Sequence, residues 1–202
     1  MNAIFYDPHQ LAPSLWQHLQ PMGWHTAATA DWGKAAWVLC MQPPADGMWA
    51  QAPQAVWLLN DVAADVAVPA DIMAFRFCGW PGFTDRAVWE LAACSPAADA
   101  SQLPGMQQAL GVQLRLVANV PGLVAPRVLA CIINEACFGL AEGICTAADM
   151  DTAMKLGTNY PQGPVSWAQQ IGPAQVQHLL QRMAQTDPRY QPHPQLLALL
   201  AP

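Results

Sequence analysis

Cysteine and histidine, the residue types most often used for metal binding and nucleophilic chemistry, are scattered along this chain without the spacing of a known site. The six cysteines include no CxxC pair, and the five histidines include no HxxxH or HExxH pair. Zinc sites are usually built from such closely spaced ligands, so the sequence predicts no metal site. Isolated cysteines in a reducing compartment act as small buried hydrophobes, and we expect that role for all six.

The signature of dinucleotide binding is also missing from the first half of the chain. A glycine-rich turn after the first strand lets backbone N–H groups and a helix N-terminus approach a pyrophosphate. Here the first predicted strand, residues 3–6, runs into Asp7, Pro8, His9 and Gln10, and no GxGxxG follows. Pro8 lacks an N–H where donors are needed. The sequence therefore predicts no cofactor-binding residues.

The charge of the chain excludes one large class of partner. Only 11% of the residues are charged and the net charge is −6, which leaves no basic patch to neutralise a run of phosphates. We therefore expect no nucleic-acid binding. The apolar run 128–138 is too short to cross a bilayer and contains Asn134 and Glu135, so we expect no membrane span. The first residues lack the pattern of a secretory leader, and we expect a cytoplasmic protein.

The elements that must position any site fall into two groups. Before residue 118, short apolar runs alternate with helical stretches, which predicts βα units and a mostly parallel sheet. After Pro121-Gly122 the pattern is helical only. We thus expect an α/β domain over residues 1–118 and an all-α domain over residues 119–202. The predicted strands are 3–6, 36–41, 55–59, 73–77 and 112–117.

Turn and capping residues divide the second half into helices. Thr146 followed by Asp149 resembles a capping box, and Pro164 and Pro173 each follow a glycine, as prolines in the first turn of a helix do. The predicted helices are 123–142, 147–156, 164–171, 173–185 and 194–200.

Several ordered motifs in this helical half resemble the C-terminal domain of 3-hydroxyacyl-CoA dehydrogenases. The resemblance begins at Val120-Pro121-Gly122, continues through Asn134-Glu135-Ala136, and ends in the segments 149–157 and 159–164. It implies a helical domain like the C-terminal domain of 6-phosphogluconate dehydrogenase, which in the family forms the dimer contact. The segments 29–40, 55–60 and 77–81 resemble, more loosely, parts of the family's Rossmann-type domain. The implied fold is a truncated Rossmann-like parallel sheet followed by this helical domain.

The resemblance also implies a chemistry whose groups are largely absent. In the family a histidine, oriented by a glutamate, removes a hydroxyl proton while hydride passes to NAD. The histidine position corresponds to Phe77, and Glu90, within one residue of the glutamate position, is the remaining catalytic candidate. Glu90 could equally be a solvated or salt-bridged carboxylate. The family's substrate-binding serine falls near Val62 and its asparagine on Pro126.

One alignment register would give Asp7 a role. If residues 3–6 correspond to the family's second strand, Asp7 is the acid that bonds the adenosine ribose; otherwise it is a turn or helix-capping residue. The phosphate cradle is missing in either register, so we expect no bound NAD.

Together these observations favour a protein that keeps the scaffold without the reaction. We expect a relative from fatty or aromatic acyl-CoA catabolism that binds an acyl-CoA or serves assembly, and that forms a homodimer through its helical domain. The alternative is an active NAD-dependent 3-hydroxyacyl-CoA dehydrogenase, which family membership alone would assign.

Overall fold

The computed structural model describes residues 2–201 and divides into two compact units, Met1–Leu123 and Val124–Pro202. The first unit contains every strand of the described residues, and the second is helical. The predicted class, an α/β sheet domain followed by an all-α domain, is confirmed. No helix within residues 2–201 has the length and apolarity that a membrane crossing requires.

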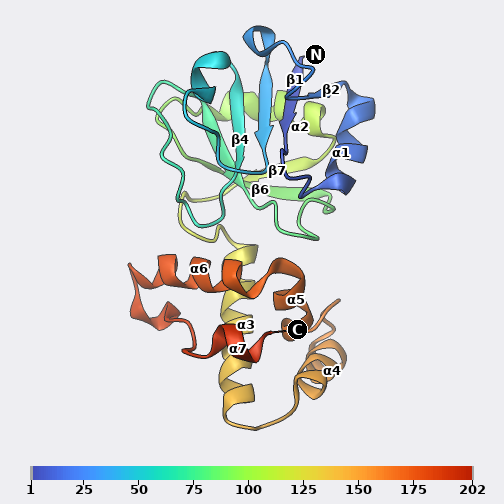
Figure 1. Ribbon diagram of the computed structural model, residues 1–202, viewed down its shortest axis with the longest axis vertical. Coiled ribbons are helices and arrows are strands. Elements are labelled where there is room, and N and C mark those ends of the chain that lie inside the picture. Colours follow the sequence, from blue (N-terminus) through green and yellow to red (C-terminus); the bar gives the residue numbers. More distant parts are fainter. Residues whose placement is uncertain (1, 202) are drawn as a thin grey trace. The chain divides into compact units, whose positions relative to one another are not determined.

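A single seven-stranded sheet forms the centre of the first unit (Figure 1). The strand order is β2-β1-β3-β4-β5-β6-β7, and every neighbouring pair is parallel except β5 and β6. The strands are β1 (Ala3–Tyr6), β2 (Trp24–Thr26), β3 (Trp37–Cys40), β4 (Val56–Asn60), β5 (Ala74–Phe77), β6 (Val88–Ala93) and β7 (Gln113–Leu116). The five predicted strands are present; β2 and the antiparallel β6 were not predicted.

The two faces of this sheet are covered differently. Helices α1 (Pro13–Leu19) and α2 (Leu103–Leu110) pack on one face and bury Leu15, Leu19 and Leu110 against it. Trp24 also donates a hydrogen bond of 2.8 Å to the carbonyl of Ala109 on this side. The other face is covered by loops and by the short 3₁₀ helix η3 (Met48–Gln51). There the indole of Trp57 is fully buried, 4.5 Å from the ring of Trp49.

The sheet changes its winding direction at β1. From β1 the chain passes through α1 to β2 on one side, whereas β3 pairs with the opposite edge of β1 and leads outward through η3. In open α/β sheets, ligands bind outside the carboxyl ends of the strands at such a switch point. Here those strand ends are Tyr6 and Cys40, which places the turn after β1 at the expected position of a ligand site.

The helical unit is organised around α3 (Ala125–Ala141), which buries Leu129, Ile133 and Cys137. Asn134 joins α3 to the end of the chain: its side chain donates to the carbonyl of Gln191 and accepts from the N–H of His193. Packed on α3 are three further helices, α5 (Pro164–Ile171), α6 (Pro173–Ala184) and α7 (Leu196–Leu199).

Helix α4 (Ala147–Thr158) differs from these helices because none of its residues is buried. Its start follows the predicted capping box: the Thr146 hydroxyl accepts from the N–H of Asp149. It lies to one side of the bundle in Figure 1 and packs chiefly against α5.

A carboxylate of α4 holds the beginning of α5. Asp151 accepts hydrogen bonds from the N–H groups of Val165 (2.8 Å) and Ser166 (3.0 Å) and from the Ser166 hydroxyl. These N–H groups belong to the first turn of α5, where no carbonyl of the helix can accept them. The carboxylate lies so close that a Cβ on Gly163 would be 2.2 Å from it. Steric fit and capping together therefore hold Asp151 against the start of α5.

Replacing Asp151 by alanine should lower the free energy of unfolding by about 1–2 kcal/mol, because the first-turn N–H groups of α5 lose their acceptor. Urea titration followed by circular dichroism measures the change. The matched control is Lys155→Ala on the same helix, at an exposed position. An Asp151→Ala midpoint equal to that of the control would contradict the capping role.

Candidate functional site

The turn between β1 and α1 uses its own carboxylate as the acceptor for its N–H groups. The N–H of Leu11 donates to Asp7 Oδ1 and that of Ala12 to Asp7 Oδ2, both at 2.9 Å. The N–H of Gln10 donates to the Asp7 carbonyl at 3.1 Å. Pro8 and Pro13 in the same turn have no N–H to offer. The N–H groups of Gln10, Leu11 and Ala12 are thus already engaged within the turn.

Asp7 also bridges the switch point itself. The Gln42 amide, which follows β3, donates to Asp7 Oδ1 at 3.0 Å. The carboxylate therefore receives three hydrogen bonds, two from its own turn and one from across the strand ends. Asn60 at the end of β4 makes a similar link, accepting from the N–H of Gly79 at 2.7 Å and donating to the carbonyl of Met41. The chain's own side chains thus connect the strand ends where the fold places a cofactor.

These residues do not fit NAD. A pyrophosphate at the β1–α1 turn would have to displace a carboxylate from its donors or lie beside it, and two like charges a few ångströms apart repel. As a ribose ligand Asp7 would have only one acceptor site left, at Oδ2, because its two oxygens already accept three hydrogen bonds within the protein. Asp7 is therefore placed as a turn-forming residue.

Phe77 and Glu90, the two positions expected for the catalytic pair, lie on opposite faces of the sheet. The Phe77 ring stacks on Trp89, with ring centroids 5.3 Å apart and an angle of 11° between the planes. Side chains alternate along a strand, so Glu90 points away from this stack, and it lines a small cavity with Cys78 and Arg86 on the other side. The neighbour of position 77 is thus an indole and not a carboxylate.

The other positions expected at a substrate site serve the fold. Val62 is buried and its carbonyl accepts the N–H of Gly122 at 2.7 Å. Pro126 lies in the first turn of α3. Within residues 2–201, no three histidine, cysteine or acidic side chains come close enough to hold a metal ion.

Burial keeps several of the thiols protonated at neutral pH. It raises the pKa of Cys40 and of Cys78 far above the ordinary thiol value, and that of Cys94 and of Cys137 to about 11. A thiol is nucleophilic as its thiolate. These four cysteines are therefore poor nucleophiles.

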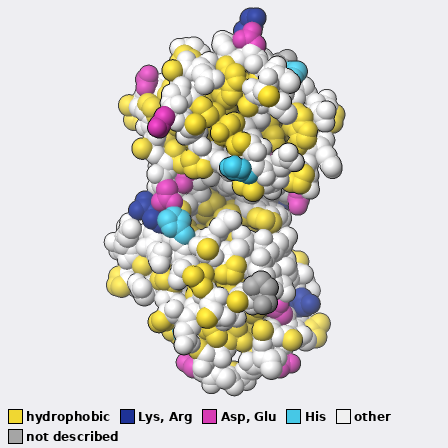
Figure 2. Space-filling view, viewed as in Figure 1, with side chains coloured by type: hydrophobic (Ala, Val, Ile, Leu, Met, Phe, Trp, Pro, Cys, Tyr) yellow, Lys and Arg dark blue, Asp and Glu magenta, His cyan; other side chains and the backbone are white. Residues whose placement is uncertain are grey.

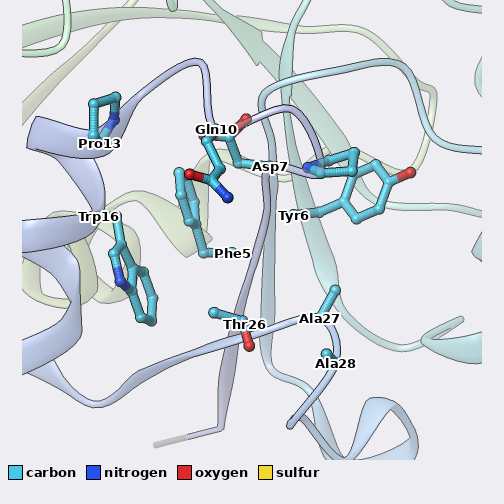
Figure 3. Close-up of a pocket in the computed structure, with 10 residues that line it drawn as sticks. Phe5, Tyr6, Asp7, Gln10, Pro13, Trp16, Thr26, Ala27 and Ala28 are labelled. Carbon is cyan, nitrogen blue, oxygen red and sulfur yellow. The ribbon is translucent and has the colours of Figure 1, made fainter.

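A pocket of about 520 Å³ opens at the carboxyl ends of β1 and β2, beside the Asp7 turn (Figure 3). Sequence analysis did not predict it, because its walls come from three separate segments. They are Phe5 to Gln10, Pro13 with Trp16 on α1, and Thr26 to Ala28. Among the candidate residues of the sequence, only Asp7 lies in this pocket.

Comparison with known proteins identifies the helical half. Residues 122–201 match the model of the 3-hydroxyacyl-CoA dehydrogenase C-terminal domain. The chain is 39% identical over 87 residues to 3-hydroxyadipyl-CoA dehydrogenase of Escherichia coli K12, covering 42% of this chain and 18% of that protein. It is 30% identical over 134 residues to human mitochondrial hydroxyacyl-coenzyme A dehydrogenase, covering 62% of this chain and 43% of the human one. The chain thus spans less than half the length of these relatives.

Solved structures extend the likeness to the sheet unit at the level of fold. Mycobacterium tuberculosis FadB2 superimposes with a TM-score of 0.71 at 18% identity, covering 99% of this chain and 85% of FadB2. The (S)-3-hydroxybutyryl-CoA dehydrogenase PaaH1 of Ralstonia eutropha gives a TM-score of 0.68 at 20% identity. The match covers 88% of this chain and 70% of PaaH1. The architecture is a Rossmann-like sheet followed by a helical domain. Residues 122–201 therefore resemble the C-terminal domain of 3-hydroxyacyl-CoA dehydrogenases in sequence, and the sheet unit resembles these enzymes in fold.

Replacing Asp7 by alanine should destabilise the protein by about 1–3 kcal/mol, since the N–H groups of Leu11 and Ala12 lose their acceptor. The exposed Asp46→Ala in another loop of the same unit is the control for loss of one negative charge. Chemical unfolding monitored by tryptophan fluorescence measures both. Equal stability of the two variants would show that the carboxylate does not hold the turn.

Proposed function

We propose that this is a 3-hydroxyacyl-CoA dehydrogenase-like protein of fatty or aromatic acyl-CoA catabolism that lacks its own NAD site and catalytic base. It serves as an acyl-CoA-binding or assembly protein. The observation that carries the proposal is the Asp7 turn, in which a carboxylate of the chain takes the donors a dinucleotide phosphate needs. The Phe77–Trp89 stack supports it, because it fills the position of the base with two apolar rings.

The second candidate is an active NAD-dependent enzyme, favoured by the names of its relatives. Glu90 would then be its catalytic carboxylate. Against it stands the sheet geometry, in which Glu90 and position 77 point to opposite faces.

The assembly role is supported by the surface of the helical unit. Helix α4 buries none of its residues, and Ile144 and Leu156 are 70% and 82% exposed. Between α3 and α4 lies an open groove of about 340 Å³, lined by Ile132, Phe138, Met150 and Met154 among others. Hydrophobic side chains are frequent and charged ones sparse on the face of this unit visible in Figure 2. A second copy related by a two-fold axis would cover this surface with the same groups.

The purified protein should not oxidise 3-hydroxyacyl-CoA with NAD, because Phe77 cannot accept the hydroxyl proton and the Asp7 turn does not suit a dinucleotide phosphate. Absorbance at 340 nm, with 3-hydroxybutyryl-CoA and 3-hydroxyadipyl-CoA as substrates, tests for NADH formation. Calorimetric titration with the same acyl-CoA compounds tests for binding. Phe77→His should not create activity, since Glu90 lies on the other face. Turnover that Glu90→Gln abolishes and Asp85→Asn leaves intact would establish the enzyme and make Glu90 catalytic.

Sedimentation equilibrium at micromolar concentration should give a mass above the 21.8 kDa of one chain. Ile144→Glu should shift the distribution toward the single chain, because a charge on this apolar surface loses its hydration on pairing. Leu11→Glu, which changes an exposed leucine of the sheet unit, should leave the distribution unchanged. A mass of one chain at every concentration would rule out the homodimer.

A further inference from the structure

The pocket beside Asp7 has the size and the walls of a small-molecule site. Its volume of about 520 Å³ falls within the range of sites that bind metabolites. The ring of Phe5 and the indole of Trp16 stack in parallel within it, 5.7 Å apart and 9° from coplanar. Figure 3 shows these two rings on one side of β1 and the Tyr6 ring on the other. Flat aromatic walls favour a flat ligand, because stacking adds to the burial of area.

The charge of the lining sets which flat ligands can enter. Among the ten lining residues, Asp7 is the acidic one, and none is lysine, arginine or histidine. In a mostly apolar pocket an anion would lose its hydration and meet a like charge, with no cation to compensate it. An uncharged ring loses little hydration free energy on entering the pocket. A ring that bears an ammonium group is attracted electrostatically by the Asp7 carboxylate.

Gln10 supplies a polar group at the mouth of this pocket. Its backbone has φ of 54°, a left-handed conformation that is costly for a residue with a side chain. In the part of the chain that the structure describes, the Gln10 carboxamide makes no hydrogen bond, and in Figure 3 it points inward near Phe5. A carboxamide both donates and accepts, so it can bond a ring N–H or a ring acceptor.

We infer that this pocket binds a planar aromatic ligand of one or two fused rings that is uncharged or cationic, and that it excludes anionic analogues of the same ring. The ring lies against Trp16 and Phe5, Gln10 bonds its edge, and Asp7 sets the charge preference. This site thus differs from a dinucleotide site at the same place in the fold, because it selects against phosphate.

Three indoles that share one ring and differ in charge test the inference: indole, tryptamine and indole-3-acetate. Calorimetric titration of the full chain should show binding of indole and tryptamine, and indole-3-acetate at least tenfold weaker. Ala28→Trp should abolish binding by filling the pocket from an exposed position, while Ala50→Trp, exposed on η3, should leave it intact. Asp7→Asn should narrow the difference between tryptamine and indole-3-acetate.

Each other outcome overturns the inference. No binding of indole and tryptamine excludes an aromatic site, and equal affinity for indole-3-acetate removes the role of Asp7. Binding that persists in Ala28→Trp places the ligand elsewhere. Circular dichroism of each variant separates misfolding from loss of binding, with Ala50→Trp as reference. Failure of the indole series leaves the acyl-CoA proposal untouched, because that proposal is tested by acyl-CoA titration and by NAD-dependent turnover.

Discussion

Backbone N–H groups in a turn need hydrogen-bond acceptors, and in the turn between β1 and α1 a carboxylate of the same chain supplies them. The turn after β1 lies at the switch point of the sheet, where the fold leaves room for a ligand. Asp7 closes that turn from within through Leu11, Ala12 and Gln42. Once a side-chain anion satisfies these donors, the turn no longer needs glycine, and it can carry Pro8 and Pro13.

In the helical unit, too, a carboxylate accepts hydrogen bonds from backbone N–H groups. Asp151 caps α5 from a neighbouring helix, so the carboxylate joins α4 to the first turn of α5. In the sheet unit the carboxylate holds a turn, whereas in the helical unit it positions a helix.

Much of this architecture could be predicted from the sequence. Prolines at 164 and 173 and the Thr146 cap marked the helices within a few residues, because these residues act on the local backbone. Strands β2 and β6 were missed for physical reasons. Strand β2 has only three residues, and one of them is the exposed His25. Strand β6 contains Glu90 directly after Trp89, so it does not form an uninterrupted apolar run.

Little of the candidate site could be predicted from the sequence, because its contacts join residues that are far apart along the chain. The absence of GxGxxG is visible in the sequence, but the hydrogen bonds of Asp7 depend on where Gln42 and Ala12 lie in space. The pairing of Phe77 with Trp89 depends on the antiparallel register of β5 and β6, in which Arg76 lies opposite Ala92. The pocket joins residues from β1, α1 and the turn after β2, and no local pattern connects them.

Helix α4 has a consequence for the motions of the helical unit. It buries no residue, and its capping contact with α5 passes through Asp151, so detaching it exposes little apolar area and leaves the packing around α3 in place. Segments of this kind open as cooperative units at a free energy well below that of global unfolding. We therefore expect the amide protons of α4 to exchange with solvent faster than those of α3, and a partner that covers α4 should slow their exchange.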